Sequence, residues 1–410
     1  MNTLEQRRAV RRVATARLVS LAGSGAAFAA LAYLIYHLTD RSNTWVAWTL
    51  LLTIGAQGVF VSVASWLGDR FDRRRVLVIT DLCAAAGFAV LMFMRTPGQY
   101  LLVAFVTAVI ESPIYAVSSA AVPNLVDDDG LSWANGVVAF GRNVGNLVGP
   151  VLGGAMVAVL AAGSNPSPAD LHTAGMVVFG LNVLTFLVSA WLVGSTPGRF
   201  NDVHDEGSEH HGAIAGMRFL FREPTLRRIA IAWTVLLLGV GMSIVGEVAL
   251  ADEFNSGSLG YGLLASAWGG GAVIGTVIAQ RRLRAANEYR SLIAAVLIAG
   301  LGFGLTAIAP WLIIALLCMV VGGVGEGVAG VAEQGIFQRR TPDDVRSRVL
   351  GALEAIVLIS LAVSFLFGGT VVDALGPRVT YAIGGITFVL AGAILWPGYT
   401  RALDANVRRP

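Results

Sequence analysis

Lysine is absent from the sequence, and all 29 basic residues are arginines. Without lysine the chain has neither a Schiff-base residue nor the phosphate-binding residue of a P-loop, which excludes both chemistries. The only two cysteines, Cys83 and Cys318, fall inside apolar segments far apart in the sequence. This predicts two small core residues and no disulfide or metal pair. His204, His210 and His211 lie in a polar stretch without a metal-site pattern, so we expect neither a metal nor a cofactor.

Charged residues are also scarce. They make up 13% of the 410 residues, compared with about 25% in soluble domains. Hydrophobic residues make up 55%, and the mean hydropathy is +0.70. These values exclude an ordinary soluble enzyme, and a net charge of only +3 gives no nucleic-acid signal. The function must therefore lie inside or between membrane spans.

Long apolar runs follow one another along the whole chain. A membrane-spanning helix needs ~20 apolar residues, and the sequence predicts twelve spans, at residues 16–38, 44–67, 76–94, 100–121, 135–162, 173–194, 229–250, 259–279, 290–309, 311–334, 349–372 and 379–397. The first run is as long as a full span, which favours a retained helix over a cleaved signal peptide. One long polar stretch divides the spans into two sets of six. We therefore expect an N-terminal six-helix bundle at 1–194, a cytoplasmic linker at 195–228 and a C-terminal six-helix bundle at 229–410.

The arginines are distributed unevenly between the two sides of these spans. The termini and the loops after every second span hold 25 of the 29 arginines, whereas the alternate loops hold only Arg41, Arg95 and Arg378. The remaining one, Arg142, falls within a span. Because cytoplasmic loops are enriched in arginine, both termini and the central linker are predicted to be cytoplasmic.

The two halves resemble each other after their fourth spans. Residues 122–128 read VPNLVDD, and residues 340–345, after the tenth span, read RTPDDV. Each stretch places a proline and paired acids just before a new span. Repeated halves around a central site are typical of secondary transporters. The sequence thus predicts an all-α membrane protein of twelve transmembrane helices in two pseudo-symmetric bundles.

A charged loop, residues 65–75, joins the second and third spans and reads SWLGDRFDRRR. It resembles the loop between spans 2 and 3 of the major facilitator superfamily, which reads roughly G-x-L-A-D-R-x-G-R-K. Five positions agree in kind: Leu67, Asp69, Arg70, Arg73 and Arg74. Ser65 and Asp72 replace the two glycines of that pattern, which changes the turn and keeps the charges. The three arginines followed by Asp81 are most similar to the drug:proton antiporter-3 branch, which includes macrolide and siderophore exporters.

This resemblance implies a cytoplasmic gate of five residues: Asp69, Arg70, Arg73, Arg74 and Asp81. In that family the loop carboxylate lies against the N-terminus of the eleventh span, where the helix dipole favours an anion. Carried over, Asp69 would hold the two halves together, and Arg73 would pair with an acid near the cytoplasmic end of another span. Asp81 and residues 127–129 are the alternatives for that acid. A simpler interpretation of the arginines is that they only determine topology.

A second motif lies in the fifth span, where glycines and one proline recur at fixed spacing. The pattern G-x8-G-x3-G-P-x2-G-G fits throughout, at Gly136, Gly145, Gly149, Pro150, Gly153 and Gly154. The major facilitator superfamily associates this pattern with antiporters. Such glycines let a neighbouring helix approach closely, and the proline removes one backbone hydrogen bond and kinks the helix. A tightly packed helix pair without a transport role is the alternative.

Two ionisable residues fall inside spans of the N-terminal half. Glu111 lies midway through the fourth span and Arg142 about two turns into the fifth. An ionisable side chain at such a depth costs about 2.5–3.5 kcal/mol on insertion scales, so each needs a partner or a function. The two could pair and open on protonation, or they could form a static ion pair. Many antiporters of the superfamily carry an arginine where Glu111 stands and an acid where Ser24 stands, so coupling through those two usual positions is not supported.

Four acids of the C-terminal half are further candidates for proton coupling, for a cavity or for the cytoplasmic gate. Glu326 is the strongest, because it lies mid-span within the glycine-rich run GGVGEG. It would exchange a proton or bind a cationic substrate, and a satisfied structural carboxyl is the alternative. Glu247 lies near the outer end of the seventh span. Glu333 and Glu354 lie nearer the cytoplasm, where we expect them to belong to the cytoplasmic gate.

These observations predict a multi-pass inner-membrane transporter that exports small amphipathic or drug-like compounds, by proton antiport with rocker-switch alternating access. A dedicated exporter of one siderophore, lipid-like compound or other native metabolite is the first alternative. A non-transporting membrane sensor or an enzyme is the second, although the spans show no cluster of nucleophile, base or metal ligands. The expected partners are a small-molecule substrate, protons and the lipid bilayer, with no nucleic acid, and the chain is expected to be a monomer.

Overall fold

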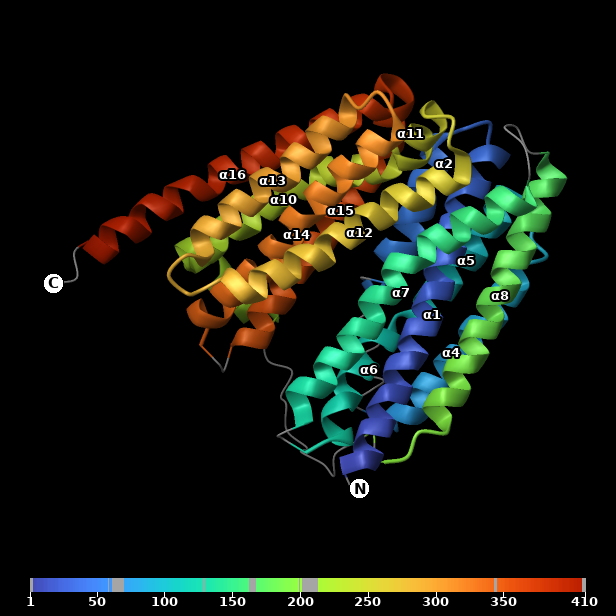
Figure 1. Ribbon diagram of the computed structural model, residues 1–410, viewed down its shortest axis with the longest axis horizontal. Coiled ribbons are helices and arrows are strands. Elements are labelled where there is room, and N and C mark those ends of the chain that lie inside the picture. Colours follow the sequence, from blue (N-terminus) through green and yellow to red (C-terminus); the bar gives the residue numbers. More distant parts are fainter. Residues whose placement is uncertain are drawn as a thin grey trace. The chain divides into compact units, whose positions relative to one another are not determined.

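The computed structural model describes residues 3–57, 59–60, 70–127, 130–161, 167–198, 200, 213–342 and 345–407. Within these ranges the chain is almost entirely helical and contains no strand. It forms two compact units (Figure 1). Unit 1 contains Met1–Ser208 and Ala251–Ser266, and unit 2 contains Glu209–Leu250 and Ala267–Pro410.

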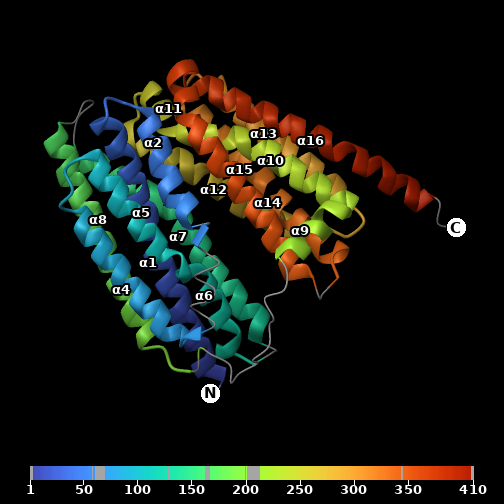
Figure 2. The same cartoon turned by 180° about the vertical axis from the view of Figure 1, so that it is seen from behind.

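Unit 1 is a bundle of long helices with shorter segments between them. Its elements are α1 (Thr3–Leu38), α2 (Asn43–Leu50), the π-helical turn η1 (Leu51–Gly55), α4 (Arg73–Leu91), α5 (Pro97–Glu111), α6 (Pro113–Ala121), the 3₁₀ turn η2 (Val122–Leu125), α7 (Leu131–Leu160) and α8 (Pro168–Gly194). Helix α1 packs along α7 and α8, and α4 packs along α8 (Figure 2). The first residues of α12 (Gly257–Arg282) also belong to unit 1.

Unit 2 contains the remaining helices. They are α9 (Ala213–Arg222), α10 (Pro224–Val245), α13 (Glu288–Ala307), α14 (Leu312–Arg340), α15 (Arg346–Leu375) and α16 (Pro377–Val407), with the first part of α11 (Glu247–Glu253) and the rest of α12. Helix α10 packs against α15 and α16, and α13 packs against α14 and α16. Aromatic rings fill this core, with the Phe303 ring 4.9 Å from Trp268 and 5.3 Å from Tyr381 between centroids.

Local sequence sets where several helices begin. Thr96 and Gln99 form a capping box ahead of Pro97 at α5, and Ser167 caps α8 in the same way. Asp72, which replaces a family glycine, accepts a hydrogen bond from the Arg75 backbone N–H at 2.9 Å and caps α4. These side chains satisfy N–H groups that a helix leaves unpaired at its start.

Two of the expected spans are divided. The fourth breaks at Ser112 between α5 and α6, because Pro113 cannot donate a backbone hydrogen bond. The seventh breaks at Gly246 between α10 and α11. Each break places an acid beside it: Glu111 is the last residue of α5, and Glu247 is the first residue of α11. An acid beside a helix break is thus found once in each unit.

Nine helices among the described residues are long and apolar enough to cross a membrane. Three expected spans are not among these nine. The span at 44–67 lies partly outside the described residues, α4 begins with three arginines and contains Asp81, and the span at 100–121 is divided at Ser112. The prediction for the cysteines is wrong for Cys83, which is exposed on α4, whereas Cys318 is half-buried. A thiol is a small hydrophobic group, so it can lie on the lipid-facing surface of a helix as well as in a protein core.

Candidate functional site

A cavity of about 470 Å³ lies within unit 1, between α1, the α2–η1 segment, α4, α5 and α7. Its walls are mostly apolar, with aromatic rings contributed by Phe28 and Phe88. Six polar side chains also line it: Ser24, Thr53, Gln57, Thr107, Glu111 and Asn146. Ligand sites are typically apolar clefts of about 300–1,000 Å³ with a few placed polar groups, and this cavity has that character.

Among the described residues that line the cavity, Glu111 is the one that can carry a charge. The Gln57 side chain donates a hydrogen bond to Glu111 Oε2 at 3.4 Å, and Oε1 has no hydrogen-bond partner among the described residues. Arg142 is half-buried on α7, and Asn146, one helical turn later, lines the cavity instead. The pairing of Glu111 with Arg142 stays a prediction. Gln57 is a partner that the sequence did not indicate.

The glycines of α7 form a row that faces the backbone of α1. A Cβ atom at Gly141, Gly145, Gly149 or Gly153 would fall closer than 3.0 Å to a carbonyl oxygen of α1. The four oxygens belong to Ala14, Leu18, Ala22 and Ala26. Both sets repeat every four residues, so each glycine faces one turn of α1, as in small-residue helix contacts of membrane proteins.

This row differs from the sequence motif at both ends. Gly136 has open space where its Cβ would be, and Gly141, outside the motif, takes part in the row. At the other end, Gly154 and Pro150 face the first turns of α12, where Ser258 Oγ donates a hydrogen bond to the Gly154 carbonyl at 2.9 Å. The motif therefore joins α7 to two segments of unit 1.

A buried ion pair lies in unit 1 and joins three helices. Arg17 of α1 lies 2.9 Å from Asp81 of α4, and Ser189 of α8 donates a hydrogen bond to the same carboxylate at 2.7 Å. The arginine count grouped Arg17 with the N-terminal arginines, and the structure shows that its side chain is buried, with 3% exposed. The signal was present in the sequence, since Arg17 falls inside the predicted span 16–38.

The predicted cytoplasmic gate is only partly described. Asp69 lies outside the described residues, as do two of the three acids at 127–129. Arg70 is exposed, and Arg73 donates hydrogen bonds to the carbonyls of Ala120 at 2.9 Å and Phe200 at 3.5 Å. Asp127 accepts a hydrogen bond from Gln6 at 2.9 Å. The pairing of Arg73 with an acid stays a prediction.

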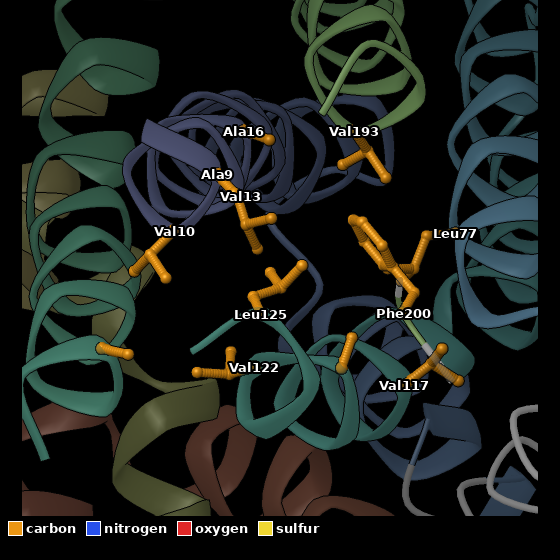
Figure 3. Packing of buried hydrophobic residues seen from close by; sticks show 12 residues of the cluster. Ala9, Val10, Val13, Ala16, Leu77, Val117, Val122, Leu125, Val193 and Phe200 are labelled. Carbon is orange, nitrogen blue, oxygen red and sulfur yellow. The ribbon is translucent and has the colours of Figure 1, made fainter. Parts of the chain in front are cut away.

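Phe200 anchors the segment that leaves α8. Its side chain is 2% exposed and packs against Val13 of α1 and Leu77 of α4 (Figure 3). The Arg74 guanidinium lies 4.7 Å from the centre of its ring, and Arg74 also donates a hydrogen bond to the Gly198 carbonyl. The arginines at the start of α4 therefore bind the first residues of the predicted linker. The polar composition of the linker did not predict these contacts.

The candidate acids of unit 2 lie in three environments. Glu247 is 7% exposed, and its Oε1 has no hydrogen-bond partner among the described residues. Glu326 lies between glycines of α14 that contact α12 and α13, and Glu333, two turns later, is hydrogen-bonded to the Trp233 side chain. Glu354 is exposed on α15. None of these acids forms an ion pair with a described residue.

Comparisons with known proteins agree with this architecture. The family model of the Major Facilitator Superfamily matches residues 13–249 and 237–409. The enterobactin exporter EntS of Escherichia coli O81 (strain ED1a) is 24% identical over 403 residues, which cover 96% of this chain and 92% of that protein. The structure of the nucleoside transporter NupG has a TM-score of 0.75 at 12% identity, covering 97% of this chain and 99% of that chain. A bacterial homologue of the iron transporter ferroportin has a TM-score of 0.73 at 16% identity, over the same shares.

Proposed function

Because the chain belongs to the Major Facilitator Superfamily of membrane transporters, we propose that it exports small amphipathic or drug-like compounds in exchange for protons. Membership of that family makes it a multi-pass transporter and not an enzyme. The observation that carries the finer proposal is the position of Glu111, a carboxyl at a helix break that lines a mostly apolar cavity.

The cavity chemistry supports this proposal. Its apolar walls and its two phenylalanine rings suit the apolar part of an amphipathic compound, and the amides and hydroxyls suit a few hydrogen bonds. Glu111 has one carboxylate oxygen bonded to Gln57 and one oxygen free for a proton or for a cationic group. A carboxyl cannot hold both at once, so proton uptake would release a bound cation, which is the exchange that antiport requires.

We infer an architecture and an alternating-access cycle that fit this role. The chain would cross the inner membrane twelve times as two six-helix bundles, with both termini in the cytoplasm, and would act as a monomer. Asp69 and Arg73 would close the cytoplasmic side in the outward-facing state. The contacts of Arg73 and Arg74 with Phe200 and Gly198 support a role of this loop at the start of the linker.

Transport in proteoliposomes tests the proposal. Purified protein is reconstituted with an imposed pH gradient, and ethidium, tetraphenylphosphonium and a neutral macrolide serve as substrates. We expect substrate-triggered proton movement in the wild type and in Asp40→Asn, which changes an exposed acid between α1 and α2. We expect its loss in Glu111→Gln, because the amide cannot exchange a proton. Exchange of labelled against unlabelled macrolide without a gradient should persist in Glu111→Gln, because a neutral compound does not need the carboxylate. Normal proton movement in that variant would contradict the role of Glu111.

A dedicated siderophore exporter is the second candidate, and the similarity to the enterobactin exporter favours it. Its cavity would recognise one scaffold instead of a range of amphipathic compounds. Competition separates the two functions: chemically unrelated cations should inhibit the transport of one another in a broad exporter. A dedicated exporter would move a catecholate siderophore such as enterobactin, and none of those cations would compete.

A further inference from the structure

A charged layer of unit 1 has no role in the transport cycle above. Arg17 donates to Asp81 Oδ2 at 2.9 Å and to Ser189 Oγ at 2.8 Å, and Ser189 Oγ donates to the same Asp81 oxygen at 2.7 Å. All three residues are buried, and Asp81 and Ser189 have no exposed surface. Three helices, α1, α4 and α8, therefore meet at one ionic contact.

This layer lies next to the cavity, on the side where α1 and α4 begin. Leu21 and Ser24, which line the cavity, follow Arg17 by one and two turns along α1. Phe88 lines it from α4, seven residues after Asp81, which corresponds to about 10 Å along a helix. The arginine distribution predicts that this side is cytoplasmic. A proton that travels from the cavity to the cytoplasm through unit 1 would reach this layer next.

The hydrogen bonds of the ion pair are unequally distributed. Both bonds reach Oδ2 of Asp81, whereas Oδ1 has no hydrogen-bond partner among the described residues, and neither do Nε and Nη1 of Arg17. An arginine–carboxylate pair is strongest when the guanidinium donates hydrogen bonds to both carboxylate oxygens. Buried polar atoms usually have a hydrogen-bond partner. The free oxygen of Asp81 can accept a proton while Arg17 and Ser189 keep their bonds.

Few groups among the described residues face Asp81. Arg17 approaches from α1 and Ser189 approaches from α8. Glu111 is the last residue of α5, which packs against α4, and the charge of Asp81 acts on it. Glu111 also has one oxygen without a partner. Two carboxyls, each with a free oxygen, thus lie in sequence from the cavity towards the predicted cytoplasmic side, and the charge on one affects the other.

We propose that Asp81 is a second proton-binding site and that protons pass between Glu111 and the cytoplasm through the Arg17–Asp81–Ser189 layer. The inference deepens the proposed function and rests on it for the role of Glu111. In the inward step, Glu111 loses its proton and becomes a carboxylate, water carries the proton, and Oδ1 of Asp81 binds it. Asp81 then releases the proton to water on the cytoplasmic side and becomes a carboxylate again. Arg17 is a positioning residue, since with Ser189 it holds Oδ2 and leaves Oδ1 free.

Infrared difference spectroscopy of the full chain in lipid vesicles tests this site without a substrate. Spectra recorded between alkaline and acidic pH detect the C=O stretch of each carboxyl that becomes protonated. We expect bands from Asp81 and Glu111 among the buried-carboxyl bands of the wild type, so that Asp81→Asn removes one band and Glu111→Gln removes a different one. Ser189→Ala should keep the Asp81 band and move it to higher pH, because the carboxylate loses a hydrogen-bond donor.

The controls distinguish the two claims. Asp40→Asn, which removes an exposed carboxyl between α1 and α2, should leave the Asp81 and Glu111 bands in place. If Asp81→Asn leaves the spectrum unchanged, the ion pair is a static brace and the proposal is overturned. If Glu111→Gln alone leaves the spectrum unchanged, the proposed function of Glu111 fails while Asp81 remains a proton site. Asp81→Asn leaves Arg17 unpaired, so the double variant Arg17→Gln with Asp81→Asn and the Ser189→Ala variant extend the test if the single variant does not fold.

Discussion

The buried acids inside the predicted spans are surrounded differently in the two units. In unit 1, Asp81 is paired with Arg17, and Glu111 lines a cavity. In unit 2, Glu247 lies beside a helix break without an ion-pair partner among the described residues, and Glu333 is bonded to an uncharged indole. Removing one partner of a buried ion pair leaves the other charge uncompensated. We therefore expect substitution of an acid inside a span to lower the stability strongly only where that acid pairs with a second charge.

The largest expected effect comes from separating the ion pair of unit 1. Arg17→Gln should destabilise the protein by about 3–5 kcal/mol, because Asp81 stays buried without its counter-charge. Thermal unfolding in detergent measures the loss. The double variant Arg17→Met with Asp81→Leu should recover most of the stability, since neither charge remains. A single variant as stable as the wild type would remove the basis of the comparison.

Packing at the glycine rows gives the next largest effect and tests whether the units share a way of joining helices. Gly149→Leu should destabilise by about 1–3 kcal/mol or more, because its side chain would meet the backbone of α1. Gly327→Leu should behave alike, since Gly327 meets the backbone of α12 at Ala272. Gly136→Leu is the matched control, with open space at its Cβ position. Equal melting temperatures for Gly136→Leu and Gly149→Leu would contradict the assigned row.

The hydrogen bond in unit 2 gives a smaller effect. Trp233→Phe keeps an aromatic ring and removes the N–H group that meets Glu333. The expected loss is about 1 kcal/mol, the usual contribution of one hydrogen bond. Chemical denaturation in mixed micelles can resolve this loss, and the double variant with Glu333→Gln gives the coupling energy. A coupling energy of zero would show that the two side chains act independently.

The smallest effect is expected at the helix break of unit 2. Glu247→Gln should change stability by no more than about 0.5 kcal/mol, because no described side chain depends on its charge. The same measurement on Asp81→Asn supplies the contrast within one protein. If Glu247→Gln destabilises as strongly as Arg17→Gln, then the acids of the two units are held in the same way.

Much of the fold follows from local pattern. The apolar runs predict the helices, and the capping residues with proline mark where α5 and α8 begin. The four-residue spacing of Gly145, Gly149 and Gly153 already places them on one face of a helix. Such features depend on neighbours within a few turns, and a single sequence displays them.

The partners across helices could not be predicted in the same way. Arg17 and Asp81 are 64 residues apart, and Gln57 and Glu111 are 54 residues apart. No periodicity links such positions, since the link is made by the packing of α1, α4 and α5. The burial of Phe200 could not be predicted for a related reason. It is an apolar residue in a polar stretch, and its contacts with Arg74 and with the apolar cluster of unit 1 come from segments far away in the sequence.

The row of glycines along α7 also limits how this transporter can change over evolutionary time. Two walls of the cavity, α1 and α7, touch backbone to backbone, so a larger residue at any of those four glycines would separate them. Change is therefore confined to the side chains that line the cavity, such as Ser24 and Phe28 of α1, Thr53 of η1 and Ala104 of α5. The lining can differ between lineages, while the spacing of α1 and α7 stays constant because no side chain fits between them.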